Sequence, residues 1–508
     1  MSIAVFFSRI LGLIRDMVMA AFFGTTYVSD AFNIAFKIPN LLRRLFGEGA
    51  LSAAFVPIYN EFGIKRGKHY QFNFAINLLS VLSFILLLMT FLGVILAPFI
   101  VRIIYPGLNS ETTELAIKLC RLMFPYLFFI GLSSTFIAIL NSHNKFFITG
   151  LSSALLNIGW ILFILFGSFI LKKQDEGLSF YAAYGVMLGG FLQTIINLPY
   201  LKKIGYKFKI ILKTKSTAMK MLWHRFIPSM IGIGIREINL IADELIASFL
   251  MPGSITALGF GSRLMQLPLG IFGISVGTAV LPEYSRLYTE KKWSGISETL
   301  RYSLHLILYI LAPITVIMVI GSELFIRLIF QRGVFNETAV YMTQQAFIYY
   351  MIGLCFFGLN QVITPLFYAA KDTKTPVIIA AFMVGLNISL NLILMRYMYH
   401  AGLALATSIT AIVQFIIMIF LIRKRIPELQ ISSVLKNICK LITILVFIFI
   451  VLYSFMRIEW QIENNYILIL KTSLFLLISL ISLLIGFHLL KPEYYKEILS
   501  SILRRIKK

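Results

Sequence analysis

Charged residues are scarce in this sequence of 508 residues, and acidic residues are scarcer than basic ones. Asp, Glu, Lys and Arg together make up 13% of the chain, whereas hydrophobic residues make up 59%. A water-soluble protein of this composition would expose too much hydrocarbon to water. The low charge content therefore excludes an ordinary soluble protein and indicates one that crosses a membrane many times.

Cysteine and histidine are also rare. The three cysteines, Cys120, Cys355 and Cys439, lie far apart in apolar segments, and the six histidines form no cluster. These positions argue against a disulfide framework and show no metal-ligand spacing. The sequence also lacks the G-x-x-x-x-G-K-[ST] loop that holds ATP phosphates. Any energy for transport therefore has to come from an ion gradient or from the membrane potential.

Long apolar runs are present in number, and they are apolar on every face. The run "LLSVLSFILLLMTFLGVILAPFIV" at 78–101 shows none of the alternation of a membrane β-strand, which excludes a β-barrel. We predict an all-α polytopic membrane protein with about 14 transmembrane helices. The predicted helices are 3–23, 29–61, 72–103, 113–141, 146–171, 179–201, 221–250, 256–286, 296–330, 337–369, 376–398, 401–422, 434–456 and 465–488.

Basic residues are unevenly distributed between alternate loops, and this predicts the orientation. One side holds most of them, including the lysines of 202–220 and the tail "LRRIKK". By the positive-inside rule, both termini are expected in the cytoplasm, as an even number of helices requires. Most of the net charge of +24 is then explained by topology and by contacts with membrane lipids, and no nucleic-acid partner is implied.

An internal repeat organises the chain. "IVRIIYPGLNSET" at 100–112 reappears as "FIRLIFQRGVFNET" at 325–338, and three residue pairs share an offset of 225: Pro57 with Pro282, Tyr59 with Tyr284, and Arg102 with Arg327. We expect two six-helix bundles related by a pseudo-two-fold axis along the membrane normal, facing a central cavity suited to alternating access. The predicted parts are an N-terminal lobe (1–203), a basic cytoplasmic linker (204–220), a C-terminal lobe (221–425), two extra helices (426–490) and a basic cytoplasmic tail (491–508).

Several charged residues lie inside predicted helices, where a charge costs on the order of 3 kcal/mol. A single residue such as Lys37 could extend to the interface, a reading as reasonable as a functional one. The whole set needs ion-pair partners or a water-filled cavity, and Asp16 and Glu48 are expected to pair with arginines. Its cationic excess favours an anionic substrate, because the guanidinium fork binds phosphate or pyrophosphate at two points. The set comprises Arg9, Arg15, Asp16, Asp30, Arg43, Arg44, Glu48 and Arg263.

Four segments together resemble the MurJ (MviN) family of lipid II flippases, in the multidrug/oligosaccharidyl-lipid/polysaccharide exporter (MOP) superfamily. They are "SRILGLIRD" (8–16), "SDAFNIAFKIPNLLRRLFGEGALSAAFVPIY" (29–59), "SRLMQLPLGIFGISVGTAVLPEYSR" (262–286) and "FYAAKDTKTP" (367–376). The resemblance covers essentially the whole chain. It implies translocation of the lipid-linked peptidoglycan precursor from the cytoplasmic to the outer leaflet of the bacterial inner membrane, for use by cell-wall synthesis proteins.

The resemblance also assigns roles. It places the family's cavity arginines on Arg9, Arg15, Arg43 and Arg263, and makes the lipid II pyrophosphate their partner. The family's acidic positions fall on Asp16, Asp30 and Glu48. The two helices after the repeat would line a hydrophobic groove for the polyprenyl tail.

A second set of residues could hold a coupling ion. Asn387 and Asn391 share one helix face, and Asp243 and Thr407 lie in other helices, so oxygen atoms from three helices could coordinate Na⁺. In one branch of the family a sodium site maps onto these residues and the backbone carbonyl of Leu403. The asparagines could equally hydrogen-bond across the bundle without a metal ion.

Three further charges in the predicted helix 221–250 have no role in this scheme: Arg236, Glu237 and Glu244, for which a pairing of Arg236 with either glutamate is one option. Two rival functions remain. A MOP exporter of another polyprenyl-linked oligosaccharide or of drugs would lack the 29–59 motif and the last two helices. A membrane-embedded glycosyltransferase would need a large outer loop with catalytic carboxylates, whereas the outer loops here are short, so we expect no enzyme.

Overall fold

The computed structural model describes residues 2–44, 50–207, 209–214, 216–426, 432–458 and 465–490. Every regular element in these ranges is helical, which confirms the predicted all-α class. The chain forms two compact units, here described separately. Unit 1 comprises Met1–Thr256 with Arg332–Phe335, and unit 2 comprises Ala257–Gln331 with Asn336–Lys508.

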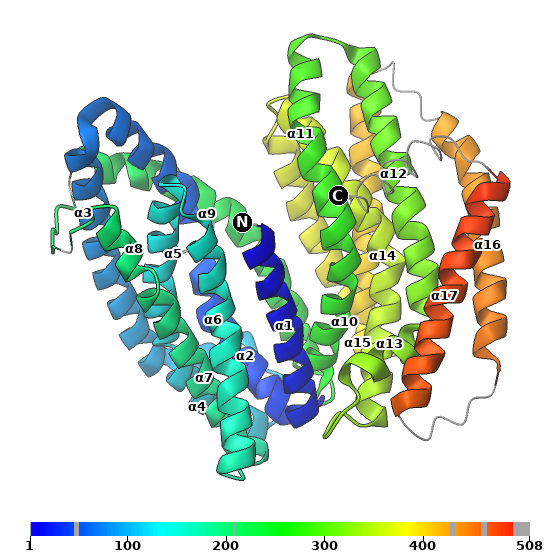
Figure 1. Cartoon of the computed structure of the whole chain (residues 1–508), viewed down its shortest axis with the longest axis horizontal. Coiled ribbons are helices and arrows are strands. Elements are labelled where there is room, and N and C mark those ends of the chain that lie inside the picture. Colours follow the sequence, from blue (N-terminus) through cyan, green and yellow to red (C-terminus); the bar gives the residue numbers. More distant parts are fainter. Residues whose placement is uncertain are drawn as a thin grey trace. The chain divides into compact units, whose positions relative to one another are not determined.

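Unit 1 contains the helices labelled α1 to α9 in Figure 1. They are α1 (Ser2–Phe23), α2 (Tyr27–Arg43), α3 (Ala50–Ile104), α4 (Ser110–Met123), α5 (Tyr126–Ser142), α6 (Phe146–Leu165) with the π-helical turn η2 (Phe166–Ile170), α7 (Asp175–Ile195), α8 (Leu198–Lys203) and α9 (Thr217–Ala247). The predicted C-terminal lobe began at residue 221, whereas the compact units divide at Thr256 and leave α9 with unit 1. The two repeat lobes themselves stay a prediction.

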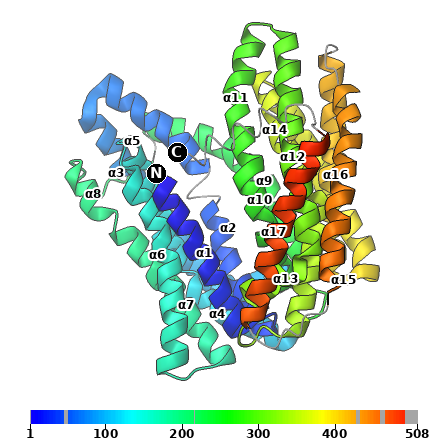
Figure 2. The ribbon, with the colours of Figure 1, turned by 45° about the vertical axis from the view of Figure 1, so that its right-hand side comes forward.

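Unit 2 begins within α10 and runs to the end of the chain. Its helices are α10 (Ser254–Pro268) with the π-helical turn η3 (Leu269–Gly273), α11 (Ile274–Thr289), α12 (Trp293–Ile320), α13 (Ser322–Phe330), α14 (Glu337–Ala369), α15 (Lys374–Arg425), α16 (Ser432–Met456) and α17 (Asn465–Leu490). The last two pack side by side (Figure 2), and Ile444, Ile448 and Phe475 are buried between them and their neighbours.

Two long helices contain breaks close to predicted boundaries. In α3, Gly67 has φ 80° and ψ 169°, so the chain turns between the predicted helices 29–61 and 72–103. In α15, Tyr399 has φ 50° and ψ −133°, between the predicted helices 376–398 and 401–422. The described residues contain 9 helices long and apolar enough to span a membrane, or 10 with the bent α4–α5 pair. The chain is therefore a multi-pass membrane protein, and the count of fourteen stays a prediction.

The predicted sequence repeat recurs in local structure. Arg102 lies in the last turn of α3 and Arg327 in the last turn of α13. After each, an asparagine caps the next helix: the side chains of Asn109 and Asn336 accept hydrogen bonds from the backbone of α4 and α14. Two equivalent segments thus end and restart a helix in the same way.

Candidate functional site: an ion-paired face of helix α2

In α1, three hydrogen bonds and one aromatic ring hold Arg15. Its Nε and Nη2 donate to Asp16 Oδ1 at 3.1 and 2.8 Å, and its Nη1 donates to Asn157 Oδ1 at 3.0 Å. The guanidinium carbon lies 4.7 Å from the centroid of the Trp160 ring, a cation–π distance. The predicted pairing of Asp16 with an arginine is confirmed, and the Arg15 guanidinium is fixed by α1 and α6.

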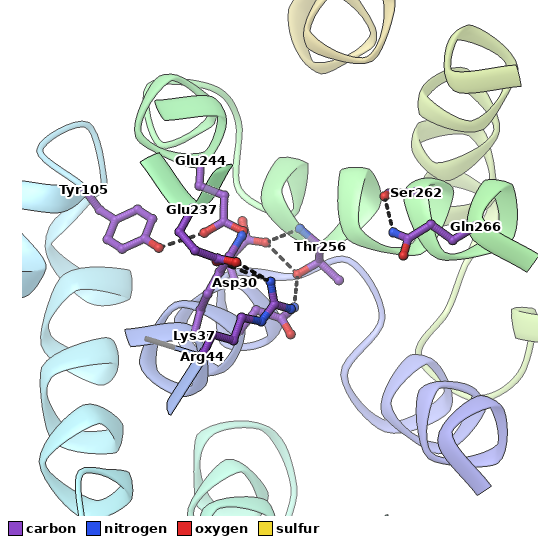
Figure 3. Close-up of polar contacts among 10 residues, drawn as sticks. Asp30, Lys37, Arg44, Tyr105, Glu237, Glu244, Thr256, Ser262 and Gln266 are labelled. Atoms are coloured by element: carbon purple, nitrogen blue, oxygen red, sulfur yellow. Dashed lines mark hydrogen bonds and ion pairs between the residues drawn. The ribbon is translucent and has the colours of Figure 1, made fainter. Parts of the chain in front are cut away.

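Asp30 ties the start of α2 to the turn between α9 and α10. Its Oδ2 accepts from the Gly253 backbone N–H at 2.6 Å, and its Oδ1 accepts from the Thr256 N–H and hydroxyl at 2.8 and 2.7 Å. The residue is 3% exposed. Both oxygens of Asp30 are thus used inside unit 1, and their contacts hold two helix ends together (Figure 3). The place of Asp30 in the substrate site stays a prediction.

Two ion pairs continue along the same face of α2. Lys37 pairs with Glu244 of α9, and Glu244 Oε2 also accepts from the Tyr105 hydroxyl at 2.7 Å. Arg44 Nη1 donates to the two carboxylate oxygens of Glu237 at 3.0 and 3.3 Å. Figure 3 shows both α9 carboxylates pointing toward the α2 cations.

The spacing explains why these contacts form in register. Residues 30, 37 and 44 are seven apart, about two helical turns, so they share one face of α2. Glu237 and Glu244 are also seven apart, and their pairing order is antiparallel to that of the α2 cations. We call the contacts of Asp30, Lys37 and Arg44 with α9 and its following turn the α2–α9 ladder.

The ladder answers one open question. Lys37 is half-buried and paired rather than extended alone to an interface. Glu237 and Glu244 each pair with a cation of α2, and the suggested pairing of Arg236 stays a prediction. Charges on α9 alone do not predict these partners; the signal was the matching seven-residue spacing of Lys37 and Arg44 in the predicted helix 29–61.

The remaining predicted substrate residues are placed as follows. Arg9 is exposed on α1, and Arg43 Nε donates to Asn40 Oδ1 at 2.7 Å. Arg263 is exposed on α10 and belongs to unit 2. Glu48 lies outside the described residues, so its predicted pairing stays a prediction. Of the predicted substrate residues in unit 1, Arg15 and Asp16 therefore pair with each other. Asp30 and Arg44 both belong to the α2–α9 ladder, where each contacts a different partner.

The predicted sodium ligands form two local pairs in unit 2. Asn391 Nδ2 donates to Asn387 Oδ1 at 3.0 Å, and the Thr407 hydroxyl donates to the Leu403 carbonyl at 3.0 Å. Both asparagines are buried. Asp243 lies on α9 in unit 1. The oxygen donors suit a hard cation, and Asn387 Oδ1 and the Leu403 carbonyl each already accept a hydrogen bond from another member of the set.

Fold and site together define a polytopic α-helical membrane protein of the MOP transporter fold, with ion pairs inside one unit. A solved inward-facing multidrug resistance MATE family transporter of the MOP superfamily has this fold, with a TM-score of 0.66 and 15% identity over 83% of this chain and 95% of that one.

The chain belongs to the family described as lipid II flippase MurJ, whose model matches residues 19–486. A probable lipid II flippase MurJ of Buchnera aphidicola is 34% identical over 95% of this chain and 94% of its own length. One from Rickettsia prowazekii is 36% identical over 80% of this chain and 79% of its own length. A solved lipid II flippase MurJ in the inward closed conformation aligns with a TM-score of 0.78 and 29% identity, covering 96% of this chain and 98% of that chain. Membership of a flippase family confirms the predicted family and transporter class, and the prediction that the chain is not an enzyme.

Proposed function

We propose that this protein is a lipid II flippase that moves the lipid-linked peptidoglycan precursor from the cytoplasmic to the outer leaflet by alternating access. The observation that carries this function is membership of the lipid II flippase family over residues 19–486. The cationic excess of α1 and α2 supports it independently, because the substrate presents a diphosphate where its sugar joins the lipid. The membrane is the bacterial inner membrane, and both termini lie in the cytoplasm.

Arginines supply the diphosphate contacts in this proposal. Arg9, Arg15, Arg43, Arg44 and Arg263 are the donors, because a guanidinium can hold two phosphate oxygens at once and stays charged. Asp16 orients Arg15, and Asp30 anchors the start of α2, the helix whose other end carries Arg43 and Arg44. Glu48 is assigned a pairing role of the same kind. Arg15 is already fully oriented, which favours a fixed contact point, whereas Arg44 reaches Glu237 through Nη1 and makes no other hydrogen bond with a residue that the structure describes.

The coupling ion is a separate part of the proposal. Na⁺ would be held by oxygens of Asp243, Asn387, Asn391, Leu403 and Thr407, and its binding would replace the two hydrogen bonds now made within this set. The ion would supply the energy of its gradient. Helices α16 and α17 would accommodate the polyprenyl tail, and cell-wall synthesis proteins would take up the translocated product.

Complementation tests the substrate assignment. A bacterium depleted of its own lipid II flippase is given this chain, and lipid II in the outer leaflet is measured. We expect rescue by the wild type and loss of rescue with Arg43→Ala at normal expression, whereas Arg121→Ala, which removes an exposed arginine at the end of α4, should rescue.

A well-expressed wild type that fails to rescue would redirect the substrate toward another polyprenyl-linked oligosaccharide or a drug of the MOP exporters. Rescue by Arg43→Ala would leave the flippase function standing and contradict the arginine contacts. Arg43→Lys separates charge from geometry: we expect it to be defective as well, because an ammonium cannot form the two-point contact.

A further inference from the structure

The α2–α9 ladder consists of three contacts, which we call rungs, made by Asp30, Lys37 and Arg44. They differ in how much of the α2 residue is exposed to solvent. Asp30 is 3% exposed, the side chain of Lys37 is 28% exposed, and that of Arg44 is 41% exposed. In the Lys37 rung both carboxylate oxygens of Glu244 already have a partner. One oxygen faces Lys37, and the other accepts a hydrogen bond from Tyr105, which is itself buried. We call this rung closed. Exposure therefore rises along α2 toward Arg44.

The Arg44 rung is asymmetric. The carboxylate of Glu237 is almost completely buried, with 7% of its side chain exposed. Arg44 uses only Nη1 to reach it, and its Nε and Nη2 form no hydrogen bond with the described residues. Arg44 thus presents unused donors on a half-exposed side chain, while its counter-ion is held in the protein.

The rung can also open without disturbing helix packing. Helix α2 packs mainly against α4, and α9 packs mainly against α3. Long side chains, rather than close backbone contact, join α2 to α9 at this end. A rotamer change of Arg44 would separate it from Glu237 and leave both helices in place.

We propose that Glu237 is the resident counter-ion of Arg44, which the diphosphate of the substrate replaces on binding, while the Lys37–Glu244–Tyr105 rung stays closed. This inference rests on the proposed function. A buried carboxylate that loses its partner is costly, so the incoming anion has to offset that cost. A diphosphate can do so better than a monophosphate because it carries more charge. Glu237 therefore lowers the affinity of the site for every anion that displaces it, and limits how tightly the substrate is held.

Binding to the purified full-length protein tests the proposal, with lipid II and undecaprenyl phosphate as the two probes. In Glu237→Gln we expect lipid II to bind on the order of tenfold more tightly, the size of one lost charge-assisted contact. Undecaprenyl phosphate should gain no more than lipid II, because an anion recovers at most the cost of displacing Glu237, and one that leaves Glu237 in place recovers less. Glu244→Gln is the matched control on the same helix, and should lower thermal stability and leave both affinities unchanged.

A double-mutant cycle isolates the pair. In an Arg44→Gln background, Glu237→Gln should have no further effect on either affinity. Unchanged or weaker lipid II binding by Glu237→Gln, or the same gain without Arg44, would overturn the counter-ion role and leave the proposed function standing. Failure of the wild type to bind lipid II would instead refute the proposed function. Should Glu237→Gln not fold, Glu237→Asp, which shortens the side chain, should give a smaller change in the same direction.

Discussion

Replacing Asp30 by Asn should destabilise the protein by about 2 to 3 kcal/mol, although the two side chains have the same shape. The carboxylate accepts three hydrogen bonds, one on Oδ2 from Gly253 and two on Oδ1 from Thr256. An amide has only one oxygen, so its NH₂ group must face at least one of these donors. The loss is one charge-assisted hydrogen bond and one buried N–H left without an acceptor, each worth about 1 to 3 kcal/mol and not fully additive.

Asp30→Ala removes all three acceptor contacts, and we expect a loss of about 3 to 5 kcal/mol. The free energy of unfolding in mixed detergent micelles measures both variants. Hydrogen exchange at the Gly253 and Thr256 amides should accelerate in each. Glu111→Gln, which changes an exposed acid in the first turn of α4, is the control and should stay within about 0.5 kcal/mol of the wild type. Equal stability of Asp30→Asn and wild type would refute the assignment of the carboxylate as the clamp on the α9–α10 turn.

Three further expectations concern other contacts of unit 1. Tyr105→Phe removes the hydroxyl that donates to Glu244 at 2.7 Å, and should cost about 1.5 to 3 kcal/mol in the same unfolding assay; a smaller loss than 0.5 kcal/mol would contradict a closed rung. Gly253→Ala should reduce folded yield on size-exclusion chromatography, because φ is 91° there and a Cβ would lie 2.1 Å from a backbone oxygen in the α1–α2 turn. Burial and two nearby lysines lower the pKa of His143, which follows α5 and lies beside the Tyr59 hydroxyl. Neutral His143 therefore stabilises the fold above the ordinary histidine pKa, and this stability is lost as the pH falls below that value. The melting temperature should drop between about pH 7.5 and 5 more steeply in the wild type than in His143→Gln, and parallel curves would contradict this role of His143.

Much of the fold was predictable because membrane helices follow simple rules. Length and hydropathy place the breaks at Gly67 and Tyr399 between predicted helices. The predicted helices 29–61 and 296–330 were too long, because α2 ends at Arg43 and α12 ends at Ile320. One interruption was predictable and was missed. Helix α4 ends at Met123 and α5 starts at Tyr126 with a 45° bend, and Pro125 stands between them. Proline lacks the backbone N–H that a continuous helix needs, so Pro125 was the available signal for this break.

The candidate site was predictable in its residues and less so in their partners. Charge scarcity in an apolar chain drew attention to Arg15, Asp16 and Arg44, and the structure pairs all three. The sequence could not show that Asp30 would bind backbone N–H groups more than 220 positions away, because almost every residue type has a backbone N–H and side-chain identity does not mark which of them is the donor. The hydrogen bond that Tyr105 donates to Glu244 joins two side chains 139 positions apart, and the sequence alone does not show which distant side chains meet.

Charge balance along α2 links stability to transport. The α9 carboxylates neutralise Lys37 and Arg44 inside the first unit, so the protein can fold without an anion while keeping cations within the membrane. The rung that is most exposed is also the one whose cation was predicted from sequence to contact the substrate. A protein that must bind a diphosphate and then release it benefits from an internal anion of this kind, because the carboxylate stabilises the empty site and thereby limits how tightly the substrate is held. On this reasoning, removal of the Glu237 charge should strengthen binding and slow release together.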